Sequence, residues 1–381
     1  MSDLVLHGHI LTPHGFVRGR LTARDSQIAS IDGHAVDESS ARASDLPLYV
    51  PGFIDLHVHG GAGLDTMQAG QAVAAVARLH ARHGTTALLA TTMTAPTADI
   101  VRAFEAAAPA IRQRPAGAAA ILGLHLEGPF LSAQRLGAQP DFTREGSLQE
   151  VQSLHAIAPI RLITLAPEVA SHMALIEALV AQGFVVQLGH SAASYEQGLE
   201  ALSRGARGFT HLFNAMSPLH HRAPGLVGAA LAHATHAEII PDLLHVHPGA
   251  LRVALRAIPH LHCVTDATAA AGMPDGVYPL GRQMVHKCLG GVRLADGTLA
   301  GSTLTMDQAL RNLVHTLALS LEEASRLVSS HAADFIGEAA RGRLQALAFA
   351  DIVQLDRDLQ VQQVWVQGQP VLEGAAHEAR A

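Results

Sequence analysis

The sequence has few cysteines, no long cluster of basic residues and no long apolar run, and each absence excludes a class of protein. The two cysteines, Cys263 and Cys288, are too few for a disulfide framework, and neither belongs to a Cys-x-x-Cys pair. We therefore expect both to be buried as small apolar side chains, in a protein of a reducing compartment such as the cytoplasm.

Charge and hydropathy argue against two kinds of partner. The formal net charge is −7 and no long Lys/Arg cluster is present, so we expect no nucleic-acid partner. Charged residues, Pro or Gly break the apolar stretches before they are long enough to span a bilayer. The first residues, MSDLVLHGHILTPHG, lack the basic and then apolar pattern of a signal peptide. We therefore expect neither secretion nor contact with a membrane.

Apolar residues and histidine are abundant. Hydrophobic residues make up 49% of the 381 positions and the mean hydropathy is +0.21, which is enough for a large buried core. The chain has 25 histidines against 26 lysines and arginines together. Because no single site uses so many imidazoles, the informative histidines are those at the ends of predicted strands.

The pattern along the chain predicts an α/β fold with two domains. Residues 1–50 and 346–381 read as short β-strands joined by Gly and Asp turns. Between them, residues 51–345 alternate short apolar runs with amphipathic Ala/Leu-rich stretches, about eight times, as in a (β/α)₈ barrel. We predict a TIM-type barrel over 51–345 and a small β-sandwich domain formed by both termini.

The stretch PGFIDLHVHGGAG places His57 and His59 at the end of the first barrel strand. Residues i and i+2 of a strand point to the same face, so the two imidazoles project into one space. The pair could bind a metal ion, or it could be two ordinary polar residues on a loop. Such a short pattern does not separate these interpretations.

Four more acid/base or ligand-type side chains fall at predicted strand ends. They are Glu127 in LHLEGPF, His190 in VVQLGHS, His211 in GFTHLFNAM and Asp266 in HCVTDAT. Taken singly, each has a structural explanation, as a turn residue, a loop residue or a helix N-cap. Together they favour a metal site, because imidazole and carboxylate groups are the usual ligands of zinc and iron in hydrolases and barrel enzymes carry their reactive groups at this face.

The same stretches resemble the amidohydrolase superfamily, and within it the N-acetylglucosamine-6-phosphate deacetylase family. The matching segments run in order along nearly the whole chain: PGFIDLHVHG, HLEGPF, LGHS, THLFNAM, APGLVGA, TDAT, DGTLAGSTLTM and ADIVQLD. The resemblance implies a metal-dependent hydrolase barrel with a small β-domain. It also implies hydrolysis of the N-acetyl group of N-acetylglucosamine 6-phosphate.

The resemblance also assigns residues by position. Glu127, His190 and His211 match the principal metal ligands, and His57 with His59 match a pair that supports a second metal in some members, with Glu127 as the bridge. We therefore expect one or two divalent cations per chain, zinc or iron. Asp266 matches the catalytic acid/base. The sugar-phosphate contacts match Asn214, Ala215, Arg222 and His245, and because the arginine can come from a neighbouring subunit, we expect a homodimer.

One position departs from the family pattern. Twelve residues after the glutamate ligand, family members commonly have a histidine that touches the substrate, and here Gln139 stands there. Glutamine can donate a hydrogen bond but cannot become a cation. This difference leaves open a related substrate, such as N-acetylgalactosamine 6-phosphate.

Two further interpretations remain from the sequence. The chain could be another amide hydrolase on the same scaffold, since one fold hosts many chemistries. Asn214, Arg222 and His245 argue against that, because together they suit a phosphorylated sugar. A non-catalytic barrel is disfavoured by the complete ligand set with Asp266.

Overall fold

The computed structural model describes residues 3–371, and its centre is a closed barrel of parallel strands. Six strands form one sheet in the order β12-β11-β10-β9-β8-β5, and β13 pairs with β14. The bounds of these strands are β5 Phe53–Val58, β8 Thr85–Thr91, β9 Ala120–Glu127, β10 Ile160–Leu165, β11 Val186–Leu188, β12 Gly208–Phe209, β13 His236–Ile239 and β14 His260–Cys263.

Two backbone contacts close the ring between these sheets. After β12, the Leu212 N–H donates to the carbonyl of Glu238 in β13 at 2.9 Å. After β14, the Asp266 N–H donates to the carbonyl of His57 in β5 at 2.9 Å, and Val58 and Ala267 form a parallel bridge. The predicted (β/α)₈ barrel is confirmed.

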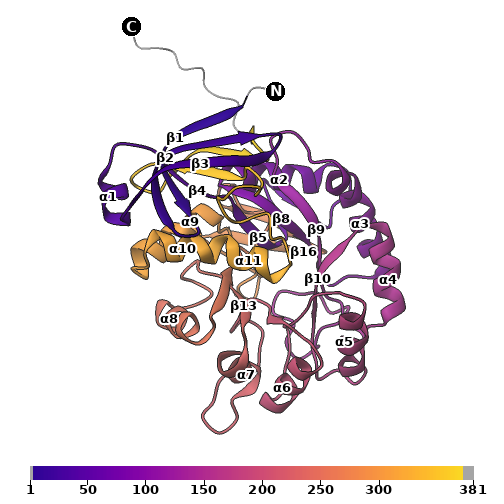
Figure 1. Cartoon of the computed structure of the whole chain (residues 1–381). Helices are drawn as coiled ribbons and strands as arrows, with labels where there is room; N and C mark the ends of the chain where they lie inside the picture. Colours follow the sequence, from indigo (N-terminus) through magenta and orange to yellow (C-terminus); the bar gives the residue numbers. More distant parts are fainter. Residues whose placement is uncertain (1–2, 372–381) are drawn as a thin grey trace.

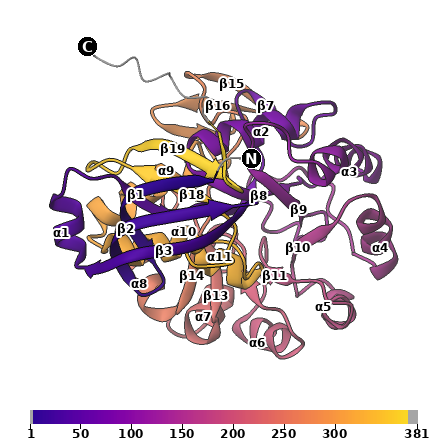
Figure 2. The same ribbon diagram turned by 45° about the horizontal axis from the view of Figure 1, so that its top comes forward.

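Helices follow the strands and form the outer layer of the barrel (Figure 2). Several begin at the side chains expected of N-caps: the Ser147 hydroxyl accepts from the Glu150 N–H, and Ser194 forms a capping box with Gln197. The bounds of the helices are α2 Ala72–Arg82, α3 Thr97–Arg112, α4 Leu148–Ile157, α5 His172–Ala181, α6 Tyr195–Ser203, α7 Gly225–His233, α8 Pro248–Ala257, α9 Met306–Arg311, the π-helical turn Asn312–Thr316, α10 Leu321–Val328 and α11 Ser330–Phe335.

Both ends of the chain meet in one small β-domain, as predicted (Figure 1). Its single seven-stranded sheet has the order β20-β19-β18-β4-β1-β2-β3, so the C-terminal strand β18 pairs with the N-terminal strand β4. The strands are β1 Leu4–Thr12, β2 Gly15–Arg24, β3 Gln27–Val36, β4 Leu48–Pro51, β18 Ile352–Leu355, β19 Val361–Val366 and β20 Gln369–Pro370, with helix α1 at Glu38–Ala43. Residues 372–381 of the predicted domain lie outside the described residues.

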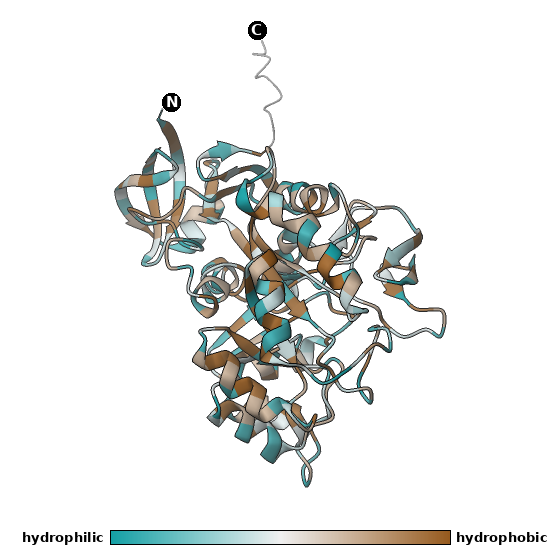
Figure 3. Cartoon of the chain, turned by 90° about the vertical axis from the view of Figure 1, so that its right-hand side faces the viewer, coloured by the Kyte–Doolittle hydropathy of each residue, from teal (hydrophilic) through white to brown (hydrophobic). Residues whose placement is uncertain are grey.

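Apolar side chains divide between two main cores. The larger core fills the barrel and the helix layer, and it also takes in Leu48 and Val50 of β4 and Val364 of β19. A smaller core lies within the terminal sheet, with Ile10 and Trp365 among its members. Figure 3 shows brown, apolar segments on the inner strands of the barrel. The shared packing of β4 and β19 fixes the small domain against the barrel.

An antiparallel sheet that the sequence analysis did not predict follows β14. It comprises β15 (Gly276–Leu280), β16 (Gln283–Cys288) and β17 (Gly291–Arg293). Cys288 ends β16 and is exposed, so the expectation of burial was wrong for this residue, whereas Cys263 is buried. The side chain of Cys288 stands beside an exposed turn, where no core forms around it.

Within the described residues, 3–371, no helix combines the length and the apolar character needed to cross a bilayer.

Candidate metal centre and active site

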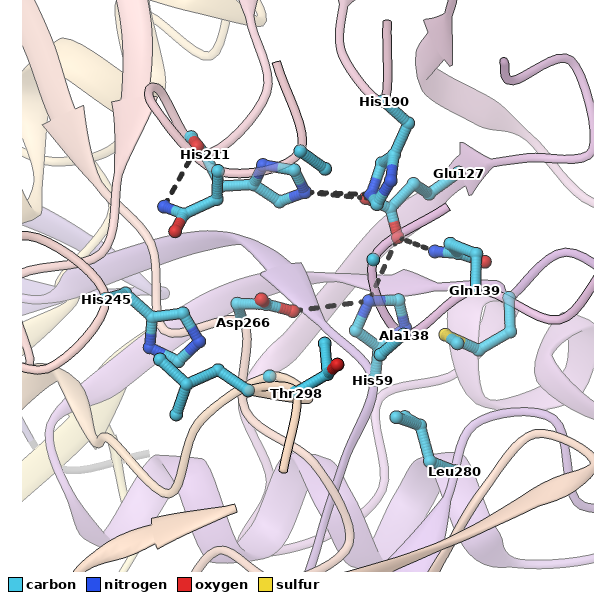
Figure 4. Close-up of a pocket in the computed structure, with 16 residues that line it drawn as sticks. His59, Glu127, Ala138, Gln139, His190, His211, His245, Asp266, Leu280 and Thr298 are labelled. Atoms are coloured by element: carbon cyan, nitrogen blue, oxygen red, sulfur yellow. Dashed lines mark hydrogen bonds and ion pairs between the residues drawn. The ribbon is translucent and has the colours of Figure 1, made fainter. Parts of the chain in front are cut away.

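Five of the predicted site residues meet at the carboxyl ends of the barrel strands: His59, Glu127, His190, His211 and Asp266 (Figure 4). Glu127 is the last residue of β9, His57 lies within β5, and His59 follows that strand directly. His190 and His211 come two residues after β11 and β12. The shared edge of the parallel strands therefore brings together candidate ligands that are far apart in sequence.

A first cluster gathers around one oxygen of Glu127. Glu127 Oε1 lies 3.1 Å from His190 Nε2 and 3.1 Å from His211 Nε2, and the two imidazole nitrogens are 3.0 Å apart. All three residues are at least 95% buried. The spacing of these three donor atoms is suited to a single metal ion.

A second cluster gathers around the other oxygen. Glu127 Oε2 lies 3.1 Å from His59 Nε2 and 3.5 Å from His57 Nε2, and these two nitrogens are 3.1 Å apart. His57 and His59 therefore converge, as their alternation in the strand predicted. Because its two oxygens face different histidine pairs, the Glu127 carboxylate lies between two candidate metal positions.

Contacts on the far side of two rings determine which nitrogen faces the cluster. The Nδ1 of His190 lies 2.9 Å from the carbonyl oxygen of Arg135, which can only accept, so this nitrogen donates and Nε2 carries a lone pair. His57 Nδ1 lies 3.0 Å from the Glu238 carboxylate. Carboxylate and carbonyl partners of this kind orient metal-bound histidines in proteins.

The electrostatics of the site favour a positive charge between these groups. Burial lowers the pKa of His59, but its bonds to the carboxylates of Asp266 and Glu127 outweigh burial and raise that pKa to about 9. For His57, Glu127 and Glu238 likewise outweigh burial and raise the pKa well above its usual range. Carboxylates and facing nitrogen lone pairs so close together need protons or a metal cation. The residues therefore fit a divalent metal ion.

A second layer of polar residues beneath the site was missed in the sequence. Glu238 of β13 is fully buried; its Oε2 lies 3.0 Å from His57 Nδ1, and its Oε1 accepts from Gln187 Nε2 at 2.9 Å. The sequence feature that could have indicated Glu238 is its position, as the single acidic residue of the predominantly buried strand HAEI. His125 is buried, and its ring nitrogens bond to the carbonyl oxygen of Leu56 and to the hydroxyl of Thr164.

Asp266 faces the second cluster from the end of β14. Its Oδ1 lies 3.4 Å from His59 Nε2 and 3.6 Å from His57 Nε2. Burial raises the pKa of this carboxyl, but the hydrogen bond from His59 and the charge of His57 outweigh burial, so its pKa lies below the usual value. Asp266 is therefore placed and ionised as a proton acceptor needs to be.

Most of the predicted substrate residues line one cavity with the ligands. The cavity measures about 230 Å³ and is bordered by His59, Glu127, His190, His211 and Asp266. Gln139, Asn214, Ala215 and His245 line the same space.

The predicted phosphate ligand Arg222 lies apart from this cavity. Arg222 is exposed on the loop after His211, with its guanidinium 2.8 Å from His221 Nε2, and it lines a different hollow beside Tyr195 and Gln197. His220 and His221 are exposed too. Among the described residues, 3–371, no Lys or Arg lines this cavity.

Known sequences similar to this chain include deacetylases of two N-acetylhexosamine 6-phosphates. An N-acetylglucosamine-6-phosphate deacetylase of Lysinibacillus sphaericus is 40% identical over 359 residues, which are 89% of this chain and 90% of the relative. An N-acetylgalactosamine-6-phosphate deacetylase of Escherichia coli O157:H7 is 39% identical over 377 residues, covering 97% of this chain and 99% of the relative.

Solved structures agree. An N-acetylglucosamine-6-phosphate deacetylase from Mycobacterium smegmatis, an aspartate-to-alanine mutant in complex with N-acetyl-D-glucosamine 6-phosphate, superposes with a TM-score of 0.89 at 34% identity, over 98% of this chain and 100% of the other. The Thermotoga maritima deacetylase gives a TM-score of 0.89 at 30% identity, over 97% and 100%. A sequence model of the amidohydrolase family matches residues 48–371. On the evidence of this match, of the relatives along its whole length and of the shared barrel, the chain belongs to the amidohydrolase family.

Proposed function

We propose that the chain hydrolyses the N-acetyl group of N-acetylglucosamine 6-phosphate, giving glucosamine 6-phosphate and acetate. The observation that carries the proposal is the convergence of Glu127, His190, His211 and Asp266 on one cavity. The relatives at 39–40% identity support the reaction class, since both act as deacetylases of an N-acetylhexosamine 6-phosphate.

Glu127, His190 and His211 would hold a divalent cation, zinc or iron, and His57 with His59 would hold a second one through the other oxygen of Glu127. When bound, the cation polarises the amide carbonyl and acidifies water, which otherwise is a poor nucleophile at neutral pH. His57 and His190 keep their Nε2 lone pairs toward the cation because Glu238 and Arg135 hold their Nδ1 atoms.

Asp266 moves the proton in this mechanism. Its carboxylate takes a proton from the attacking water and then delivers it to the nitrogen of the departing amine. Without that delivery the nitrogen would have to leave as an amide anion, which is a far poorer leaving group. Proton transfer by a placed side chain contributes about 10²–10⁴ in rate. Asp266 Oδ1 lies 3.4 Å from His59 Nε2, so the carboxylate is beside the metal positions.

The sugar phosphate would lie along Asn214, Ala215 and His245. His245 is held by Asp242, whose Oδ2 lies 2.6 Å from His245 Nδ1, so the Nε2 side of the ring is left to face the substrate. A phosphate dianion needs cationic partners, and the cavity lining described above offers no Lys or Arg. We therefore propose that Arg222 of a second copy of the chain completes the site and that the protein is a cytoplasmic homodimer.

Acetate release tests the activity and the choice of sugar. The panel contains N-acetylglucosamine 6-phosphate, its galacto epimer and both sugars without phosphate, with zinc or iron added to metal-free protein. We expect the 6-phosphate of N-acetylglucosamine to be the best substrate. A clear preference for the galacto epimer would favour the activity of the Escherichia coli relative instead.

The same assay tests the phosphate contact. Arg222→Ala removes charge-assisted bonds worth about 1.5–3 kcal/mol each, so KM for the 6-phosphate should rise at least about tenfold with a smaller change in kcat. Arg204→Ala is a suitable control, because the guanidinium of Arg204 bonds to Glu177 and Glu200 on the helix surface and does not line the cavity. Equal losses on phosphorylated and unphosphorylated sugars would remove the phosphate from the proposal.

A further inference from the structure

Gln139 is held by two hydrogen bonds to protein groups next to the candidate metal positions. Its Oε1 accepts from the backbone N–H of Thr94 at 2.7 Å, and its Nε2 donates to Glu127 Oε2 at 2.6 Å. The side chain is only 6% exposed. Figure 4 shows the amide directed at the carboxylate of Glu127.

The two partners leave the amide only one orientation. A backbone N–H can only donate, so the amide oxygen must face Thr94, and a carboxylate oxygen accepts, so the NH₂ group must face Glu127. The reversed amide would bring two donors together at Thr94 and two acceptors together at Glu127. Gln139 therefore presents a fixed donor to Glu127, supported by the main chain.

Glu127 needs such a fixed partner because its two oxygens have different tasks. Oε1 faces His190 and His211, whereas Oε2 faces His57 and His59. Rotation about the last side-chain bond would turn Oε2 away from the second pair. Among the contacts of Oε2 within residues 3–371, the bond from Gln139 is the shortest and comes from a group that always donates, whereas the other contacts are to histidine nitrogens.

We infer that Gln139 is a positioning residue that holds Glu127 Oε2 at the His57 and His59 pair and so sets the affinity of the second metal position. This differs from the expectation that Gln139 contacts the substrate. The inference rests on the proposed function for the presence of a metal ion, but not for the identity of the sugar.

Metal titration without any sugar tests the inference. Metal-free wild type, Gln139→Met and Gln139→Asn are titrated with Co²⁺, followed by calorimetry and visible absorption. Methionine keeps the size of the side chain without the hydrogen bonds, and asparagine is one methylene too short to reach both partners. Removal of an outer-shell partner weakens metal binding about 10–100-fold. We expect that loss at the second site, with less than about threefold change at the first.

Gln283→Met provides the matched control. Gln283 also donates its amide to this loop, to the carbonyl of Ala138 at 2.7 Å, but it does not touch Glu127. Its variant should bind both Co²⁺ ions as wild type does. The inference is overturned if wild type binds a single ion, if Gln139→Met and Gln139→Asn bind the second ion normally, or if Gln283→Met weakens it equally. If the titrations give the expected differences between the variants but wild type releases no acetate, only the proposed function is refuted.

Discussion

Among the candidate metal ligands and the candidate proton acceptor, three residues have left-handed backbone. The φ angles are +47° at His190, +28° at His211 and +49° at Asp266, where residues other than glycine are uncommon. Each costs on the order of 1–3 kcal/mol, and such strain concentrates at functional sites. Because the strands before them are short, these backbone turns are what direct the side chains inward.

Asparagine tolerates this backbone conformation at least as well as aspartate, so Asp266→Asn tests the chemistry without adding strain. The variant keeps the shape of the side chain but cannot accept the proton. We expect kcat to fall by about 10²–10⁴, with bound metal close to the wild-type amount. Turnover within a few-fold of wild type would assign proton transfer to another residue. Metal analysis of the same sample separates lost chemistry from a lost cation.

The two histidine pairs should differ in their effect on metal content. His190→Ala removes a ligand of the first cluster, so purified protein should lose most of its metal and its activity. His57→Ala leaves Glu127 Oε1 with His190 and His211, so one metal ion should remain, with partial activity. Metal content by mass spectrometry and acetate release measure both. Full metal loss in His57→Ala would show that the positions fill only together.

The sequence was informative about the candidate ligands and less informative about the residues that hold them in place. His190 and His211 could be predicted because each polar residue follows an apolar strand, and parallel strands end at one edge. Glu238 was missed because it lies inside a strand and supports His57 from below. The orientation of Gln139 depends on the Thr94 N–H, a main-chain group that no residue pattern reveals.

At the scale of elements, the β15–β17 sheet contributes to the cavity lining and is held in place by hydrogen bonds at one turn. The turn between β15 and β16 is tied at Gly281, whose N–H donates to Asp65 Oδ2 at 2.8 Å, and Arg282 bonds to Asp99. Leu280, just before the turn, lines the cavity. This sheet was not predicted, because its strands are short and half-exposed and so lack a clear alternation.

Asp65→Asn should loosen this sheet. The Asp65 carboxylate accepts from the N–H groups of Met67 and Gly281 with different oxygens, whereas asparagine has one oxygen and would turn an NH₂ toward one of these donors. An unpaired buried donor costs about 1–3 kcal/mol. We expect faster limited proteolysis within 276–293 and a higher KM.

Arg282→Ala is the comparison for that experiment. The Arg282 side chain is 54% exposed, so its ion pair with Asp99 contributes little, about 0–1 kcal/mol. Equal proteolysis of both variants and wild type would show that the turn is held by packing instead.

At the scale of the whole molecule, half-buried and fully buried histidines make the fold sensitive to acid. Burial lowers the pKa of His236 and of His262 to about 4, and His262 is fully buried with neither ring nitrogen hydrogen-bonded within the described residues. The unfolded chain binds these protons near pH 6.5, whereas the folded protein does not until about pH 4. The free energy of unfolding should therefore fall as the pH drops from 6.5 toward 4.

His262→Met removes one of these titrating groups and so measures its contribution to the pH dependence of stability. Denaturant unfolding of chelator-treated protein at pH 7.5 and pH 5.0 gives the loss of stability for each chain. Wild type should lose more than the variant, by up to about 1.4 kcal/mol per pH unit below 6.5. Identical losses would mean that His262 is protonated equally in both states. The chelator removes the contribution of metal release, which also follows pH.

The pairing of β4 with β18 has a consequence for the nascent chain on the ribosome. Residues 52–351 separate these neighbours, so β1–β4 emerge first and must wait while the barrel is synthesised. During that time the β4 edge that later receives β18 presents unpaired N–H and C=O groups, which can recruit strands from other chains. A message cut short before codon 352 would leave that edge open permanently. Completion of translation is thus the step that protects the newly made protein from aggregation.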